Sequence, residues 1–257
     1  MTGIQITDFV VVLFIFLRIV AALSAAPVFG NKAMPVLSRM ILSFFLAVII
    51  FLAVDTSSWE IEFTISFLAI TAIKEIITGL IIGFMVNLVF YGISFAGTFI
   101  GFDIGLMMAQ VMNPLEETNN NVVGEMIYFS AMLIFFLVNG HHYVLKGLGY
   151  SFTIIPIGSE TINESVNIII IKYSAQVFIL AVKIASPIIV SFFLVKLAEG
   201  VTARVIPQMQ VFFVTQPLKI GLGFILLSIG VPIYVHVIKN LLESYENSLF
   251  ELIKAME

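Results

Sequence analysis

The sequence predicts an all-α fold of polytopic, membrane-associated helical hairpins, on the evidence of composition, segment length and periodicity. Hydrophobic residues make up 60% of the 257 residues and charged residues 11%, whereas soluble domains carry about 45–50% and about 25%. So few polar side chains cannot cover such an apolar chain in water. The period-2 alternation of a strand is missing, and a bilayer accepts only helices or closed barrels. We therefore expect helices in or beside a membrane.

Apolar segments separated by short polar breaks mark the expected helices. Several of them reach the roughly 20 residues that span a hydrocarbon core, whereas others are shorter or longer. Residues 63–112 form a nearly continuous apolar run. The expected segments are 9–26, 37–54, 63–91, 93–112, 122–138, 166–197 and 211–238.

Two parts follow from this pattern. Residues 1–160 hold several apolar segments, and residues 161–257 have the pattern of a helical hairpin with a C-terminal tail. The stretch Thr161-Ile162-Asn163-Glu164 has the sequence of a capping box, in which the first and fourth side chains satisfy free backbone N–H groups. It predicts the start of the first hairpin helix.

Charged residues inside the apolar segments are the first anomaly. A charge at the centre of a bilayer costs at least about 2.5–3.5 kcal/mol. Such residues either line a wet transport path or are buried against polar groups of neighbouring subunits. Lys172 and Lys183 are eleven residues apart, which places them on one helix face about 16 Å from each other. The residues concerned are Arg18, Lys74, Glu75, Asp103, Lys172 and Lys183.

A row of glycines is the second feature. Gly97, Gly101 and Gly105 recur every four residues, and Gly79 and Gly83 have the same spacing upstream. Small residues at this spacing let two helix backbones approach closely in an apolar medium. They predict tight helix packing and assembly.

The third feature is a methionine group that leads into a polar, Asn-rich stretch. This stretch is either an ordinary surface loop or a loop folded into a pore. Thioether side chains are flexible and conform to irregular surfaces, so neighbouring methionines can seal a pore and still yield to a passing chain. The candidate gate residues are Met107, Met108, Met112, Asn113, Pro114, Glu116, Glu117, Asn119, Asn120 and Asn121.

Catalytic, metal and nucleic-acid functions find no support in the sequence. The chain has no Cys, and the adjacent His141 and His142 should diverge on a helix, with His236 the only other histidine. Such a set does not complete a site of three or four ligands. No Gly-x-Ser-x-Gly occurs and no Lys precedes Ser or Thr, which excludes a Walker A loop. The net charge of −4 is spread out, unlike the clustered cations of nucleic-acid binders. We expect no enzyme activity, cofactor or metal.

Short motifs from Phe16 to Ile220 resemble, in order and spacing, the FliR family of type III secretion export-gate subunits. Two departures concern one loop: Gln210 stands where an Asn is common, and Thr215-Gln216 where a Gly-apolar pair is common. The matching stretches are Phe16-Leu17-Arg18, Ala26-Pro27-Val28-Phe29-Gly30, Met34-Pro35 with Arg39, Glu75-Ile76-Ile77-Thr78-Gly79 with Gly83, Ala96-Gly97 with Gly101 and Gly105, Asn113-Pro114, Asn139-Gly140-His141-His142, Ser151-Phe152, Ile155-Pro156-Ile157-Gly158, Gly200 with Arg204, Pro207-Gln208-Met209 and Pro217-Leu218-Lys219-Ile220.

The resemblance implies a core subunit of the flagellar export gate. Members of this family join FliP and FliQ in a channel for unfolded flagellar axial proteins, beside the export components FlhB and FlhA, in the inner membrane of the flagellar basal body. The complex projects toward the periplasm. The resemblance also implies a FliP-like fold for residues 1–160 and a FliQ-like hairpin for 161–257. Positions 106–121 match the loop that plugs the closed pore. The charges, Arg204 among them, then face protein rather than lipid.

Other functions remain open at the level of sequence. An independent membrane carrier or channel would act alone and would show a symmetric repeat with broken helices. The chain also fits the equivalent subunit of a virulence secretion system. An intramembrane enzyme would need a nucleophile with a base, or a metal group. A structural membrane anchor is the simplest alternative.

Overall fold

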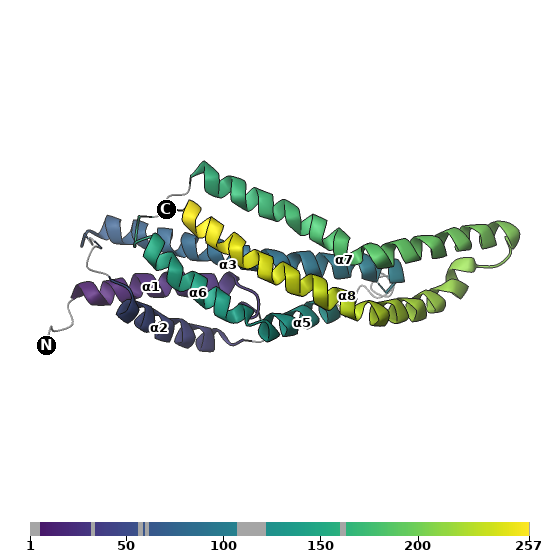
Figure 1. Cartoon of the computed structure of the whole chain (residues 1–257), viewed down its shortest axis with the longest axis horizontal. Coiled ribbons are helices and arrows are strands. Elements are labelled where there is room, and N and C mark those ends of the chain that lie inside the picture. Colours follow the sequence, from purple (N-terminus) through teal and green to yellow (C-terminus); the bar gives the residue numbers. More distant parts are fainter. Residues whose placement is uncertain are drawn as a thin grey trace. The chain divides into compact units, whose positions relative to one another are not determined.

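The computed structural model describes residues 6–31, 34–55, 59, 62–106, 122–159 and 163–256. Within these ranges the chain is helical apart from short connections and has no strand, which confirms the predicted all-α class (Figure 1). The helices are α1 (Ile6–Ala25), α2 (Val36–Ala53), α3 (Ile65–Ile104), α5 (Val122–Leu137), α6 (Gly140–Ile154), α7 (Glu164–Val205) and α8 (Val211–Ala255).

Five of the described helices are long and apolar enough to cross a membrane, namely α1, α2, α3, α7 and α8. Helices α5 and α6 add a sixth candidate span if they are counted together, although they meet at an angle of 68°. Many large apolar side chains on these helices are exposed within the chain. The described part of the molecule is therefore that of a membrane-embedded protein.

The chain forms two compact units that are interleaved in sequence. Unit 1 consists of Met1–Leu88, Asn139–Tyr173 and Glu243–Glu257, and unit 2 of Val89–Val138 and Ser174–Leu242. Helices α3, α7 and α8 each contribute one part to either unit. The division at residues 160 and 161, with its FliP-like and FliQ-like parts, stays a prediction.

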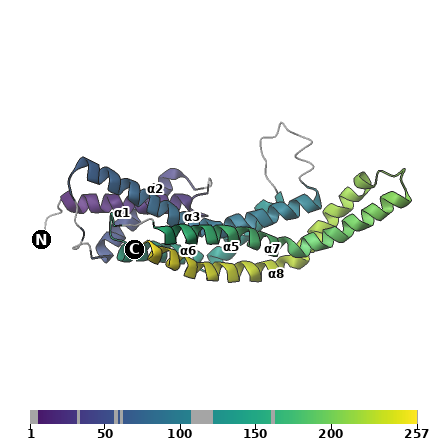
Figure 2. The same ribbon diagram turned by 90° about the horizontal axis from the view of Figure 1, so that it is seen from above.

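Unit 1 is built around α1, the first part of α3, and α6. Gly79 and Gly83 of α3 face α1 so closely that an added Cβ would lie 2.9 Å from Ala21 Cβ and 2.7 Å from Ala25 Cβ, respectively. Helix α2 runs alongside α1 in both views of the chain (Figures 1 and 2). The end of α8 packs on α6, where the rings of Tyr150 and Phe250 are 5.2 Å apart.

Unit 2 holds the second part of α3, α5, and a hairpin of α7 and α8. Phe90 of α3 meets Phe135 of α5 edge to face at 5.6 Å, and Phe95 of α3 lies 5.6 Å from Phe178 of α7. The long parts of α7 and α8 run side by side to the turn between them (Figure 2). Both helices contact the end of α3: Lys196 of α7 binds Asp103, and Gln216 of α8 donates to Ile104 O.

Several element boundaries differ from the sequence-based expectation. Helix α3 is continuous through Gly92. This glycine lies at a close contact with α7, where an added Cβ would be 3.2 Å from Val177 O. Helix α6 was not expected, and α8 extends to Ala255 instead of ending at 238. Helix α7 begins at Glu164, after Asn163, whose Oδ1 accepts a bond from Val166 N at 3.0 Å. Its N-cap is thus Asn163, and the predicted capping box was out of register.

Candidate functional site

Arg18 lies inside the apolar helix α1, and its side chain is fully enclosed, with an exposed fraction of 0%. An isolated ion in such a place would carry a desolvation cost of several kcal/mol. The surroundings of Arg18 must therefore supply both a counter-charge and hydrogen-bond acceptors.

Glu75 of α3 supplies the counter-charge. Arg18 Nε donates to Glu75 Oε2 at 2.5 Å, and Arg18 Nη2 donates to Glu75 Oε1 at 3.0 Å. Two parallel bonds of this kind form the fork geometry in which guanidinium and carboxylate groups bind best. The Glu75 side chain is also fully enclosed. A neutral pair thus joins α1 to α3 inside unit 1.

The third guanidinium nitrogen faces the C-terminal end of α6. Arg18 Nη1 donates to the backbone oxygens of Ser151 and Ile155, both at 3.2 Å, and lies 3.4 Å from Ser151 Oγ. The C-terminal end of a helix carries partial negative charge, which a cation stabilises. The ring of Phe152 covers the guanidinium, with Arg18 Cζ 4.3 Å from the ring centroid. Arg18 therefore binds the C-terminal end of α6.

The turn after α6 binds two neighbouring residues of α3, Lys74 and Glu75. Gly158 N donates to Glu75 Oε1 at 3.1 Å, and Lys74 Nζ donates to Gly158 O at 2.9 Å. Gly158 has φ of +77°, a left-handed conformation that glycine adopts without strain. Gly158 thus donates to Glu75 through its N–H and accepts from Lys74 through its carbonyl oxygen.

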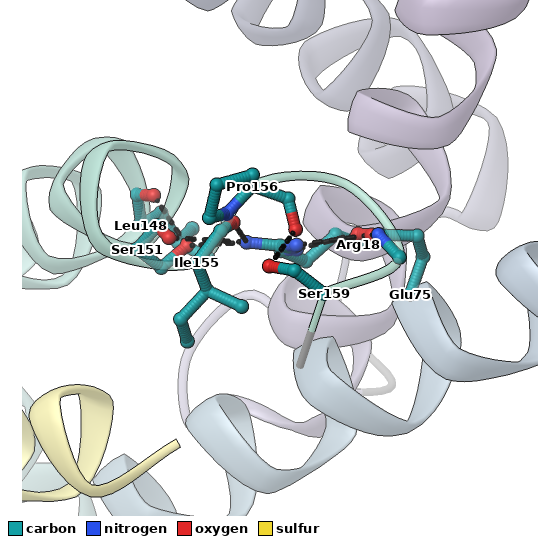
Figure 3. Close-up of polar contacts among 8 residues, drawn as sticks. Arg18, Glu75, Leu148, Ser151, Ile155, Pro156 and Ser159 are labelled. Carbon is teal, nitrogen blue, oxygen red and sulfur yellow. Dashed lines mark hydrogen bonds and ion pairs between the residues drawn. The ribbon is translucent and has the colours of Figure 1, made fainter. Parts of the chain in front are cut away.

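We refer to Arg18, Glu75, Ser151, Ile155 and Gly158 as the Arg18 cluster, of which Figure 3 labels the first four. Arg18, Glu75, Ser151 and Ile155 are fully buried, Gly158 is partly buried, and the charges of Arg18 and Glu75 balance each other. It fastens α1, α3 and the connection from α6 to α7 within unit 1. Its chemistry is that of a structural clamp rather than of a reaction site, because the charged groups bind each other.

Four of the five predicted glycines, namely Gly79, Gly83, Gly97 and Gly105, lie against another helix. An added Cβ at Gly79 would clash with Arg18 O of α1, and one at Gly97 would be 3.0 Å from Gly124 N of α5. Gly101 O accepts bonds from Gly105 N and Leu106 N, both at 3.2 Å, and Gly105 has φ of +88°. A left-handed glycine that follows a helix in this way closes its C-terminus.

A second group of charges surrounds the end of α3 in unit 2. Lys196 of α7 binds Asp103 of α3 at 2.5 Å, and Lys219 of α8 binds Glu199 of α7 at 2.7 Å. The Asp103 side chain is 9% exposed. The sequence identified Asp103 as an anomaly but did not identify its partner.

The other predicted charges are placed differently. Lys172 of α7 is half exposed and lies 3.7 Å from Glu251 of α8. Lys183 and Arg204, both on α7, have exposed side chains. The structure therefore pairs Arg18, Glu75 and Asp103 within the chain and leaves Lys183 and Arg204 at the surface of the single chain. Their role in assembly stays a prediction.

The ten candidate gate residues all lie outside the described residues. The described residues continue from the end of α3 to Leu106, in the turn after it, and begin again at Val122, the first residue of α5. The predicted gate residues are Met107, Met108, Met112, Asn113, Pro114, Glu116, Glu117, Asn119, Asn120 and Asn121.

His141 and His142 do not diverge as expected. Their ring centroids are 4.2 Å apart in the first turn of α6, because the two flexible side chains turn toward each other from adjacent positions. Within the part of the chain that the structure describes, no group of three or more His, Asp or Glu side chains has the arrangement of a metal site.

Lys196, Glu199 and Lys219 were not among the predicted site residues. One signal was available, since Lys196 and Glu199 are three residues apart and so share a helix face. The expected helix ended at residue 197, before Glu199, whereas the structure continues α7 to Val205. Spacing within one helix also says nothing about partners on another helix.

Comparison with known proteins gives a match along most of the chain. Residues 9–245 match a family described as "Bacterial export proteins, family 1". The chain is 35% identical over 232 residues to the flagellar biosynthetic protein FliR of Bacillus subtilis (strain 168), covering 89% of this chain and 88% of the relative.

Two further relatives carry the same name. The FliR protein of Escherichia coli (strain K12) is 25% identical over 240 residues, with 93% of this chain and 91% of the relative covered. That of Aquifex aeolicus (strain VF5) is 28% identical over 225 residues, with 88% and 86% covered.

Proposed function

The chain belongs to family 1 of the bacterial export proteins, and from this membership we propose that it is a core subunit of a flagellar type III protein export gate. The observation that carries the proposal is the match over residues 9–245, together with relatives named flagellar biosynthetic proteins. Those names favour the flagellar system over a virulence system. The family is one of export proteins, so the proposed role is transport and not catalysis.

In this proposal the chain forms a channel with FliP and FliQ, through which unfolded flagellar axial proteins pass. FlhB and FlhA are the neighbouring export components. Support comes from large apolar side chains on the hairpin of α7 and α8 that are more than half exposed in the single chain, namely Phe193, Leu194, Phe213 and Leu218. Exposed apolar surface of this kind marks contacts with protein or lipid.

We place the complex in the inner membrane, at the flagellar basal body, projecting toward the periplasm. Five described helices with the length and composition of membrane spans support an embedded position. The enclosed Arg18 cluster and the pair of Asp103 with Lys196 let these helices carry charges in an apolar environment, because the charged groups are paired.

The gate in this proposal is the segment 107–121. Its methionines seal the closed pore, and its polar residues follow them toward α5. Support comes from the helices on either side of the segment: Gly97 of α3 packs directly on Gly124 of α5, so these two helices are in close contact.

The test is deletion of residues 113–121, in a strain whose only copy of the gene carries the change. A variant with nine Gly and Ser residues in place of 113–121 keeps the length and serves as the matched control. Export of flagellar subunits and ion leakage across the inner membrane are both measured, and assembly of the complex is checked by purification.

We expect increased leakage from the assembled complex when 113–121 is deleted. Normal export without leakage would overturn the gate assignment. An independent channel predicts a different result, namely ion conduction by the purified chain in vesicles without FliP or FliQ.

A further inference from the structure

Helix α7 has two apolar faces within unit 2. The inner face is buried in the chain and includes Ala181, Ile184 and Phe192. The outer face includes Ile179 and Val190, which are 55% and 61% exposed. A helix that is apolar all round is enclosed on every side, by protein or by lipid. The single chain therefore leaves one apolar face of α7 without a neighbour.

The outer face contains one row of side chains along the helix axis. Positions 176, 179, 183, 186, 190, 193 and 197 are separated alternately by three and four residues, and none of them is buried. Side chains at this spacing lie in a single row that can interdigitate with a partner helix. We call Gln176, Ile179, Lys183, Ser186, Val190, Phe193 and Leu197 the α7 seam.

Polar side chains interrupt this apolar row, and one of them is bound within its own helix. Ser186 Oγ donates to Lys183 O at 3.0 Å. Pro187 lies inside α7 and has no N–H for the carbonyl group four residues before it, which is that of Lys183. The serine hydroxyl thus takes the place of the missing N–H. The backbone of Lys183 is satisfied in this way, whereas its ammonium group is not.

Lys183 is a charge in the middle of an apolar helix. It lies 19 residues after Glu164 and 22 residues before Val205, the two ends of α7, and its side chain is exposed. Lys196 and Lys219 each bind a carboxylate, but no carboxylate of the described residues lies within 4.0 Å of Lys183 Nζ. Charges in apolar surroundings need a counter-charge or water, and lipid tails offer neither.

We propose that the α7 seam is the docking surface for one apolar helix of a different subunit, and that this helix carries an Asp or Glu side chain opposite Lys183. The inference rests on the proposed function and deepens it, because it names the surface and the chemistry of the partner. Ile179, Val190 and Phe193 supply apolar contact on both sides of the ion pair and keep water from it. A single enclosed pair of this kind sets the register of two helices.

The test uses the complete chain, co-produced with the FliP and FliQ proteins of the same organism. The readout is the amount of chain that co-purifies with a tag on FliP, relative to the amount of chain in the membrane. Lys183→Met removes the charge, Lys183→Glu reverses it and Lys183→Arg keeps it. Lys146→Met, at an exposed position of α6, is the matched control. The amount of each variant in membranes without partners checks that the chain itself folds.

We expect co-purification to fall about tenfold in Lys183→Met and further in Lys183→Glu, because the carboxylate of the partner is then enclosed without a counter-charge. Lys183→Arg should keep co-purification near that of the wild-type chain. The acidic residues in the membrane helices of FliP and FliQ are then changed to lysine one at a time. One such change should restore co-purification of Lys183→Glu, and failure of all of them would contradict the ion pair.

A photo-reactive residue in place of Val190 identifies what lies against the seam without removal of any charge. An adduct with FliP or FliQ that is lost in Lys183→Glu would support the proposal. Adducts with lipid alone, or with a second copy of this chain, would overturn it.

The wild-type chain separates this inference from the proposed function. If it co-purifies with FliP and FliQ but Lys183→Met and Lys183→Glu do so equally well, Lys183 has no counter-charge in the complex, and only the inference is wrong. If the wild-type chain does not co-purify, the proposed function fails and the inference fails with it. An equal loss in Lys146→Met would show a general effect of lysine removal and would also count against the seam.

Discussion

The guanidinium of Arg18 contacts three separate parts of unit 1 at the same time. It binds the carboxylate of Glu75, the carbonyl groups at the end of α6, and the face of the Phe152 ring. A planar group with five N–H donors suits this arrangement, whereas the ammonium of lysine has three donors and no fork. We therefore expect Arg18→Lys to be poorly tolerated, despite the retained charge.

Removal of one partner of this pair should destabilise the chain strongly. Arg18→Met leaves Glu75 as an enclosed carboxylate with only Gly158 N and no counter-charge, which should cost about 3–5 kcal/mol of folding stability. The double variant Arg18→Met with Glu75→Met should lose less, because no charge remains unpaired. Thermal unfolding in detergent and the steady-state amount of protein in membranes measure both.

The conservative change Glu75→Gln tests the effect of the charge on stability without a change in side-chain size. It keeps the size of the side chain and removes the negative charge from Arg18, so we expect an instability similar to that of Arg18→Met. A double variant no more stable than the two single variants would show that packing, and not charge pairing, holds the cluster together.

At the residue scale the sequence identified Arg18, Glu75 and Asp103 as anomalies but not their partners. Arg18 and Glu75 are 57 positions apart, and Arg18 and Ser151 are 133 apart. Hydropathy records which residues are out of place in lipid, while the pairing depends on which faces of two helices meet. That information resides in the packing of glycines against α1, and no local pattern contains it.

At the scale of elements, α3 shows how glycine serves a long helix. Gly79 and Gly83 approach α1, whereas Gly92 and Gly97 approach α7 and α5. A glycine within a helix costs roughly 0.5–1 kcal/mol relative to alanine. Close approach of backbones offsets this cost through van der Waals contact. The same residue type can therefore look like a helix breaker in sequence and act as a contact in the structure.

Gly97→Ala should weaken unit 2. The new Cβ would overlap with Gly124, whose backbone must then move away, and overpacking of this kind typically costs about 1–3 kcal/mol. Gly221→Ala is the matched control, because an added Cβ at Gly221 meets nothing within 4 Å. The control should gain about 0.5–1 kcal/mol from its helical preference.

Thermal unfolding of the purified complex compares the two variants. A loss of stability in Gly97→Ala with none in Gly221→Ala would locate the effect at the contact of α3 with α5. Equal behaviour of both would mean that α3 and α5 have room to separate.

The long apolar helices could be predicted, but α6 and the end of α8 could not be predicted from hydropathy. Helix α6 contains Gly140, His141, His142 and Lys146 and is not uniformly apolar. The end of α8 buries Tyr245, Leu249 and Leu252, at spacings of three and four residues. That spacing is the signal of an amphipathic helix, which is distinct from the continuous apolar run of a membrane span.

At the scale of the whole molecule, each unit has its own set of ion pairs. The buried Arg18 cluster lies in unit 1, and the partly exposed pairs of Asp103 with Lys196 and of Glu199 with Lys219 lie in unit 2. Helices α3, α7 and α8 pass from one unit to the other, so a division of the chain by sequence position alone does not separate them. Unit 1 contains the Arg18 cluster, and unit 2 contains the helices α3 and α5 on either side of the proposed gate segment.

Partner subunits should protect the hairpin of α7 and α8. Large apolar side chains such as Phe213, Leu218 and Ile229 are 67–70% exposed in the single chain. We expect co-production with the FliP and FliQ proteins of the same organism to raise the amount of protein recovered in mild detergent and its resistance to protease. Co-production with an unrelated membrane protein is the control, and equal recovery would contradict obligate assembly.

The Arg18 cluster also imposes an order on synthesis. Glu75 leaves the ribosome 57 residues after Arg18, so the ion pair can form while most of the chain is still to be made. Ser151 follows 76 residues after Glu75, which at 5–20 residues per second is about 4–15 s later. During that interval Arg18 Nη1 has no carbonyl group from α6 to bind. Until α6 is made, Arg18 Nη1 depends on other acceptors such as water, and the Arg18 cluster can be complete only afterwards.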